Sequence, residues 1–271
     1  MTEQGVPAPG GVAGLSGAEA RALIRAGRWR QTTAGMAVGW EQANLVILPA
    51  ALADDFHRFC EANPRACPLL DITAPGSPDP RGVAPGADLR VDVPRYRVYR
   101  HGALAAEVDD LEQLWRPDFV GFLLGCSYTA DAALLRGGVP LRYIEQGTAV
   151  GMYRTNRACR PVGPFHGPLV VSMRPIPAAL VDQARRITAR QVRAHGAPVH
   201  VGDPAALGIA DLAQPDYGDP VPVAPGEVPM FWGCGVTPQA AAEAAGIELM
   251  ITHAPGCMFV TDMKGEEPAN G

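Results

Sequence analysis

The sequence predicts a mixed α/β protein, and two stretches of the chain carry this prediction. Near the C-terminus we expect three short apolar strands, at 199–201, 228–232 and 249–253, with a helix at 238–245 joining the last two into a βαβ unit. Strands that lack alternating polar residues are typical of a parallel sheet buried on both faces. Residues 117–175 resemble a small α+β unit, with a helix pair followed by three strands.

The other elements follow from local signals. Ser16 and Glu19 form the capping-box pattern that begins a helix, which we expect to run to about Ala26. The Gly- and Pro-rich stretch 63–93 predicts a long irregular loop. No internal repeat is evident in the sequence. The remaining expected elements are a strand at 44–49, a helix at 50–62, a hairpin of strands 96–100 and 103–108, helices at 117–124 and 127–135, strands near 141–144, 150–155 and 169–174, a long helix at 178–194 and a strand at 258–262.

Composition narrows the class of protein. The chain has 271 residues, of which 23 are basic and 28 acidic, and it shows no basic stripe of the kind that binds nucleic acid. No apolar run reaches the roughly 20 residues of a membrane span, and the N-terminus lacks the pattern of a signal peptide. The 6 cysteines form no Cys-x-x-Cys motif, which favours free thiols in a cytoplasmic protein.

Polar residues follow each of the three late strands, where an open parallel sheet usually binds its ligand. His200 and Asp203 follow the first of them, and His253 ends the last. Cys234 follows the second strand and lies between two glycines. Thr237 then begins a helix, whose free N–H groups favour an anion. The sequence therefore predicts an anion-binding site around Cys234.

Six segments along the chain resemble one known family in order and spacing. They are 125–129 (GCSYT), 152–156 (MYRTN), 170–175 (VVSMRP), 195–204 (HGAPVHVGDP), 231–239 (FWGCGVTPQ) and 252–256 (THAPG). With them the chain resembles the D-glutamate cyclase family, whose bacterial members carry the name hydro-lyase, from about Ala20 to Asp262. Two positions depart mildly from the family pattern: Asp131, where Glu is commoner, and Gly163, where Ala is commoner.

The resemblance implies a fold and an activity. The fold would be a three-layer α/β/α main domain, formed by 1–116 and 176–271, with a smaller two-layer α+β domain inserted at 117–175. The activity would be that of a carbon–oxygen lyase that cyclises D-glutamate, or a related small amino-dicarboxylate, to 5-oxo-D-proline with loss of water. No catalytic residues are carried over from the family, so the site is inferred from chemistry.

Lactam formation needs an anchored carboxylate, a base for the ammonium group and donors for an oxyanion. Arginine binds carboxylates in a bidentate manner, and a thiol at a helix N-terminus can serve as nucleophile or proton carrier. We therefore expect catalytic roles for Cys126, His200, Asp203, Cys234 and His253. Substrate binding is expected from Ser127, Thr129, Tyr153, Arg154, Asn156, Arg174, Gly235 and Thr237. We expect Cys126, Arg154, His200, Asp203, Cys234, Thr237 and His253 to converge on one cleft between the domains.

Each candidate also has a plain structural alternative. A free cysteine is usually a small buried residue, an arginine can pair with a structural acid, a threonine can cap a helix and Tyr153 can pack in the core. Two other functions stay open: a metal-dependent enzyme using His195, His200, His253 and Asp203, and a non-catalytic module that binds an acidic metabolite. We expect no cofactor and no tightly bound metal, a small acidic substrate as partner, no nucleic-acid or membrane partner, and a homo-oligomer as one possible state.

Overall fold

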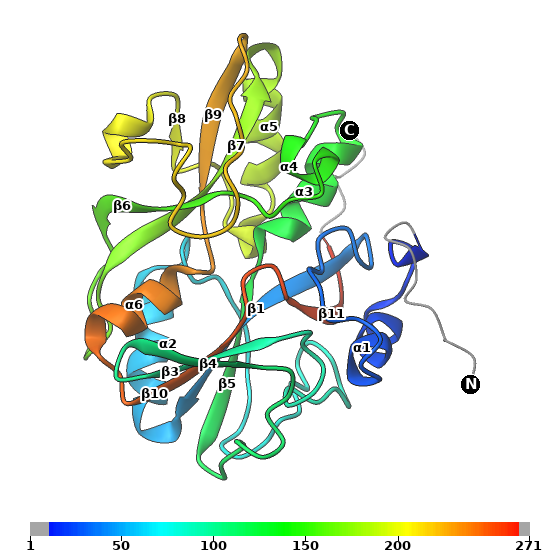
Figure 1. Cartoon of the computed structure of the whole chain (residues 1–271), viewed down its shortest axis with the longest axis vertical. Helices are drawn as coiled ribbons and strands as arrows, with labels where there is room; N and C mark the ends of the chain where they lie inside the picture. The colour runs from blue at the N-terminus through cyan, green and yellow to red at the C-terminus, as the bar shows by residue number, and fades with distance from the viewer. Residues whose placement is uncertain (1–10, 266–271) are drawn as a thin grey trace.

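The computed structural model describes residues 11–265, which form two antiparallel sheets (Figure 1). The first sheet has the order β2-β5-β1-β10-β3-β4, with β11 also pairing with β1, and the second has the order β6-β7-β9-β8. Within the described residues, no helix is long and apolar enough to cross a membrane. The strands are β1 Trp40–Pro49, β2 Leu69–Ile72, β3 Tyr96–Arg100, β4 Ala103–Val108, β5 Phe119–Gly125, β6 Met152–Ala158, β7 Pro168–Pro177, β8 His200–Val201, β9 Glu227–Gly233, β10 Leu249–His253 and β11 Phe259–Lys264.

Helices cover one face of the first sheet, and loops cover the other. The helices α2 and α6 pack on Val46, Phe122 and their neighbours, while Val83, Leu89 and other loop residues pack on the opposite face. The helices α3 and α5 pack on the second sheet. The mixed α/β class is confirmed, whereas the three-layer arrangement is not seen. The helices are α1 Gly17–Arg25, α2 Ala53–Ala62, α3 Ser127–Arg136, α4 Arg142–Glu145, α5 Val181–Ala189 and α6 Thr237–Ala245, with 3-10 turns η2 Ala50–Leu52, η3 Ala178–Leu180, η4 Val192–Ala194 and η5 Pro204–Leu207.

Several predicted elements are wrong. The helix expected at 117–124 is strand β5, which is buried along its whole length between β1 and β2; a short apolar run does not reveal its type by periodicity. The strand expected at 141–144 is helix α4, and the helix expected at 178–194 is divided into η3, α5 and η4. The strands β9 and β10 lie in different sheets and pair antiparallel with their neighbours, so the parallel βαβ unit does not exist.

Local signals gave better predictions. The capping box of Ser16 and Glu19 is present at the start of α1, and the hairpin β3–β4 and strand β10 have the predicted bounds. The division into domains at 117 and 175 stays a prediction, and the sheets do not follow it. Strand β5 belongs to the first sheet, and β8 and β9 belong to the second together with β6 and β7.

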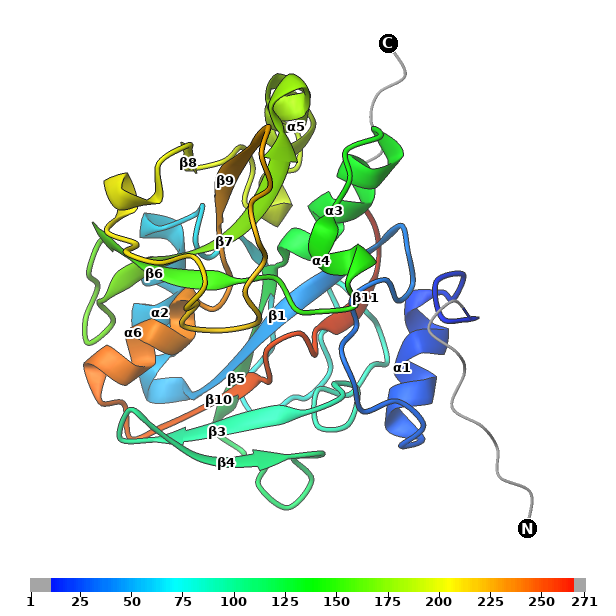
Figure 2. The same ribbon diagram turned by 45° about the horizontal axis from the view of Figure 1, so that its top comes forward.

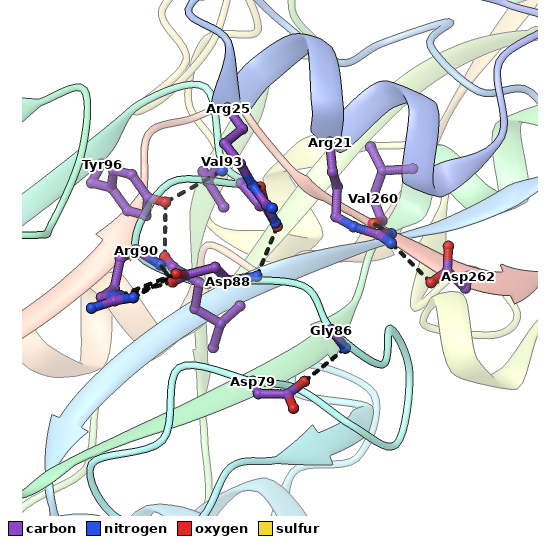
Figure 3. Close-up of polar contacts among 12 residues, drawn as sticks. Arg21, Arg25, Asp79, Gly86, Asp88, Arg90, Val93, Tyr96, Val260 and Asp262 are labelled. Carbon is purple, nitrogen blue, oxygen red and sulfur yellow. Dashed lines mark hydrogen bonds and ion pairs between the residues drawn. The ribbon is translucent and has the colours of Figure 1, made fainter.

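The long loop beneath the first sheet is held by polar contacts (Figure 3). Arg25 donates to both carboxylate oxygens of the fully buried Asp92, at 2.8 and 2.6 Å. Asp92 also accepts from the backbone N–H of Asp88, and the Tyr96 hydroxyl donates to the carbonyl of Leu89. These contacts hold the loop in one position over the core. The loop therefore has a structural role as a cover of the core.

The structure contains an internal duplication, contrary to the expectation of no repeat. At 49–52 and at 177–180 the sequence Pro-Ala-Ala-Leu links a strand through a 3-10 turn to a helix. The same four residues occur a third time at 204–207, in the turn η5, which no helix continues. The pattern Gly-Cys-x-x-Thr occurs at 125–129 and 233–237, each time linking a strand to a helix. We call the unit β1–α2–β5–α3 the first repeat and the unit β7–α5–β9–α6 the second repeat.

The two repeats have the same strand register and share a side-chain contact. In the first repeat Ala43 pairs with Gly125 and Pro49 with Phe119; in the second Val171 pairs with Gly233 and Pro177 with Glu227. A strand N–H donates to the threonine hydroxyl in both repeats, from Gln42 to Thr129 at 3.1 Å and from Val170 to Thr237 at 3.2 Å. The repeats are therefore equivalent residue by residue in this region.

The contacts between the repeats are reciprocal. Helix α2 of the first repeat packs with α6 of the second, and α3 of the first packs with α5 of the second (Figures 1 and 2). The backbone carbonyl of Arg193 lies against Gly125, and that of the equivalent Arg65 lies against Gly233. Such reciprocal pairs define an isologous interface. The repeats are thus related by a pseudo-twofold axis that passes between the two Gly-Cys junctions.

Candidate functional site

The two motif cysteines occupy equivalent strand-to-helix junctions. Cys126 is the N-cap of α3, and its Sγ accepts the backbone N–H of Tyr128 at 3.5 Å. Cys234 Sγ receives the N–H of Val236, which is also two residues later. The carbonyl of each cysteine accepts the N–H of the motif threonine, Thr129 or Thr237. The fold therefore places both thiols at the positive ends of helices.

Both thiols line one small cavity, of about 20 Å³. A cavity of this size holds about one water-sized probe, so a larger ligand enters only when the walls move. Asn44 contributes the amide that packs against Gly235. The remaining lining residues are Cys126, Ser127, Tyr128, Val150, Met152, Cys234, Gly235, Val236, Gly256 and Met258.

A buried charge cluster lies directly behind Ser127. Arg174 pairs with Asp131 through two hydrogen bonds of 2.7 and 2.9 Å, and both side chains are almost fully buried. The Nη2 atom of Arg174, which also bonds Asp131, donates to the Ser127 hydroxyl, and Nη1 donates to the Ser172 hydroxyl, each at 3.0 Å. The guanidinium also lies over the ring of Trp232, 5.4 Å from its centroid.

Arg174 determines how Ser127 can donate. A guanidinium has no acceptor, so the Ser127 oxygen must accept this bond and its own hydrogen stays available for another partner. Because Ser127 lines the cavity, its hydroxyl suits a ligand oxygen there. Arg174 was expected to bind substrate, but in this structure its partners are Asp131 and the two serines.

Burial sets the protonation of the thiols. It raises the pKa of Cys234 to about 11, against smaller opposing effects of the Val236 N–H and of Arg174. Burial raises the pKa of Cys126 further, although the Tyr128 N–H opposes it. In the closed cavity both thiols are therefore protonated at neutral pH. The lowering of the thiol pKa that we expected from the helix N-termini is smaller than the rise caused by burial.

Other predicted site residues lie away from this cavity. On β6, Arg154 pairs with Glu243 and with the hydroxyl of Tyr217. The Tyr153 hydroxyl donates to the carbonyl of Leu212 at 2.7 Å, which is the core role considered as its alternative. Asn156 is exposed on the same strand. The structure does not bring these three residues to the two thiols.

The predicted histidines also stand apart. His200 Nε2 lies 2.8 Å from the carbonyl of Asp203, whose side chain caps the turn η5. His253 is buried, and its Nδ1 accepts the N–H of Leu45 at 3.1 Å. Burial lowers the pKa of His253 to about 4. Of the residues expected to converge on one cleft, Cys126 and Cys234 line the same cavity. Thr237 bonds the carbonyl of Cys234 but does not line this cavity, and Arg154, His200, Asp203 and His253 do not line it either.

A larger cavity, of about 460 Å³, lies elsewhere, between α1 and the loop at 85–87. Its two arginines are already engaged: Arg21 with Asp262 and the carbonyl of Val260, and Arg25 with Asp92 (Figure 3). Two alanines of α1, Ala18 and Ala22, and its C-cap residue Ala26 form part of its wall. We therefore place the candidate site at the cysteines. Among residues 11–265, no group of three or more His, Cys, Asp or Glu side chains could hold a metal ion.

Some residues of the site were missed by sequence reasoning. Asn44 was seen only as the start of a strand, and Met152 and Met258 only as strand residues. The methionines come from β6 and from the turn before β11, which are distant in sequence. Asp131 was noted as a departure from the family pattern, and Arg174 was expected to bind substrate or to pair with a structural acid, but the pairing of these two residues was not predicted. The signal that could have found the site is the repeated Gly-Cys-x-x-Thr pattern.

Comparison with known proteins extends these findings. Residues 120–262 match the model of the D-glutamate cyclase family. A Rubrobacter xylanophilus protein named "Putative hydro-lyase" is 59% identical over 92% of this chain and 96% of its own length. "Putative hydro-lyase YcsI" of Bacillus subtilis is 52% identical over 93% of this chain and 98% of its own length.

A more distant likeness exists among solved structures. A nitrogen repressor-like protein from Methanococcus jannaschii covers 90% of this chain and 97% of its own, at a TM-score of 0.37 and 10% identity, which carries no argument here. The family model covers residues 120–262, and these two relatives cover 92% and 93% of the chain. The protein belongs to the D-glutamate cyclase family, and its relatives are named as hydro-lyases.

Proposed function

We propose that the protein is a hydro-lyase that cyclises a small amino-dicarboxylate, with D-glutamate as the first candidate, to a lactam with loss of water. The observation that carries the site assignment is that two thiols at two helix N-termini line the same cavity. Family membership supports the reaction class. Two positive helix ends at one cavity suit a substrate with two carboxyl groups.

The proposed reaction uses groups already at the cavity. The substrate nitrogen attacks the γ-carboxyl carbon, a C–N bond forms, and a C–O bond breaks to release water. Two protons must pass from the ammonium nitrogen to the departing carboxylate oxygen. One cysteine, as the thiolate that forms while the widened cavity admits water, takes the first proton from nitrogen, and the other cysteine gives a proton to the departing oxygen. The two cysteines then exchange roles for the second proton, so that water leaves and the pair returns to its starting protonation. The hydroxyl of Ser127, with its oxygen held by Arg174, donates to the oxyanion of the tetrahedral intermediate.

The cavity must widen before this chemistry can take place, since it is smaller than glutamate. Two methionines, Met152 and Met258, form part of its wall. Their unbranched side chains repack at low cost. We propose that their movement admits the substrate and that closure then excludes water from the intermediate.

The test is turnover of D-glutamate by the purified chain, with 5-oxo-D-proline measured by chiral chromatography. L-glutamate and D-aspartate serve as comparison substrates. We expect Cys126→Ala and Cys234→Ala to lower kcat by about 100-fold or more, as for loss of a general acid or base. Cys159→Ala is the matched control, because Cys159 is a buried free thiol in another part of the core. Equal turnover in all three variants would refute the site.

A further inference from the structure

The cavity at the two thiols is built by the duplication itself. Cys126, Ser127 and Tyr128 of the first repeat are equivalent to Cys234, Gly235 and Val236 of the second, and all six line it. The cavity therefore lies where the two Gly-Cys junctions meet, on the pseudo-twofold axis.

The remaining walls show the same equivalence. Strand β6 pairs with β7 as β11 pairs with β1, so that Tyr153 opposite Val171 matches Phe259 opposite Ala43. One residue earlier, Met152 matches Met258, and both line the cavity. Symmetry thus extends from the thiols to the side chains around them. A ligand bound on the axis has one thiol on each side.

We propose that Cys126 and Cys234 form an acid–base pair that acts on opposite faces of a single carbon, so that the protein exchanges and inverts the α-proton of its amino-dicarboxylate ligand. One sulfur, as thiolate, takes the α-proton, and the electron pair of the C–H bond passes into the adjacent carboxylate. The opposite thiol then gives its proton to the other face. Atoms and charge balance, since the two cysteines exchange protonation states, and no oxidant or cofactor is consumed.

The departures from symmetry orient the ligand. Position 127 carries a hydroxyl that accepts a hydrogen bond from Arg174, whereas the equivalent Gly235 has no side chain and contacts Asn44. For this step the ligand takes a second orientation: its α-carboxylate, which receives the electron pair, lies on the Ser127 side in place of the γ-carboxyl group, and the Ser127 hydroxyl hydrogen stabilises it. The α-carbon then lies between the sulfurs.

This inference rests on the proposed function for the class of ligand. Its test is a different measurement, namely exchange and inversion at the α-carbon. The purified chain is incubated in D2O with D-glutamate and, separately, with L-glutamate. Proton NMR measures loss of the α-proton signal, and chiral chromatography measures inversion. We expect α-deuterium from both enantiomers, with the rate rising with pH as the thiolate fraction rises.

Single-thiol variants give the sharper result. We expect Cys126→Ala and Cys234→Ala each to lose inversion by at least about 100-fold. Each should keep α-deuterium exchange in one enantiomer only, and the two variants should keep opposite enantiomers. That opposite selectivity is not produced by misfolding. Cys159→Ala, with the same loss of a buried thiol in another part of the core, should exchange both enantiomers normally.

The outcomes separate the two proposals. Formation of 5-oxoproline without any α-deuterium in substrate or product overturns this inference and leaves the cyclase proposal standing. Exchange in both enantiomers without 5-oxoproline overturns the cyclase proposal and supports the inference. Exchange that is equal in both variants and the parent protein also overturns the inference, since the thiols would then have no part in it.

Discussion

Gly235 shows how closely the second repeat approaches the first. A Cβ built at this position would lie 2.0 Å from Asn44 Nδ2, and Asn44 itself donates to the carbonyl of Gly125 at 2.7 Å. From the sequence we expected that glycine here lets a ligand approach the backbone. The structure adds a second reason, because the space beside Gly235 is filled by a side chain of strand β1.

Gly235→Ala is expected to lower stability by about 1–3 kcal/mol, the usual cost of overpacking a filled site. Chemical denaturation measures the change. Gly14→Ala is the matched control, because nothing lies within 4 Å of a Cβ at Gly14. If the Asn44→Ser background removes most of the penalty, the clash with Asn44 is its cause; an unchanged stability in Gly235→Ala would contradict the packing seen here.

The pair of Asp131 and Arg174 combines a structural and a functional role. Arg174→Met alone should destabilise the protein by about 3–5 kcal/mol, because it leaves a buried carboxylate without its partner. The double variant with Asp131→Leu should recover much of this loss, since both charges are then removed. Its activity should stay low, because the oxygen of Ser127 has lost its donor. A double variant that is both stable and fully active would remove Arg174 from the site.

At the scale of elements, the equivalence of the two junctions makes a quantitative prediction. Thr129→Val and Thr237→Val each leave a buried strand N–H, of Gln42 or Val170, without its acceptor. Each should cost about 1–3 kcal/mol, and the two costs should be similar. Thr148→Val is the control, since Thr148 is only partly buried. A large cost at one position and none at the other would show that the repeats differ in their contacts.

Elements with local signals were predictable from the sequence, and those defined by distant partners were not. The capping box of α1 and the turn between β3 and β4 depend on a few neighbouring residues. Strand β5 was predicted as a helix because an apolar run of this length fits either a helix or a strand. Only its pairing with β1 and β2 shows that it is a strand. Strands β9 and β10 were predicted to lie in one sheet because the sequence does not show which distant strands they pair with.

The candidate site was predictable to a similar extent. The two motif thiols and Ser127 were found from the glycines and helix starts around them, which are local features. Arg154 and His200 were included because they lie in conspicuous segments, but their strands direct them to surface partners. The pseudo-twofold relation was missed because each repeated pattern is only four or five residues long and separated by unequal loops.

On the scale of the whole molecule, two buried histidines couple stability to pH. Burial lowers the pKa of His195 and of His253 to about 4, whereas the unfolded chain titrates near its ordinary value of about 6.5. Between these values the unfolded chain binds protons that the folded protein does not. Stability should therefore fall as the pH drops from about 6.5 towards 4, by on the order of 3 kcal/mol for each histidine.

The free energy of unfolding measured against pH tests this coupling. His253→Asn should flatten the curve below pH of about 6.5, the ordinary histidine pKa, because one buried titrating group is gone. His57→Gln is the control substitution, since His57 is only partly buried, beside Glu61. An equal slope in His253→Asn and the parent protein would mean that His253 is not held neutral by burial.

We propose that the substrate binds in the cavity between Cys126 and Cys234. A crystal structure of Cys234→Ala with D-glutamate tests it most directly, because the variant should bind the ligand but turn it over slowly. We predict ligand density between Cys126 and position 234, with a carboxylate oxygen accepting from the Ser127 hydroxyl and with Met152 and Met258 displaced. Density for the ligand only at another place, such as the cavity beside α1, with the thiol cavity closed, would contradict the claim.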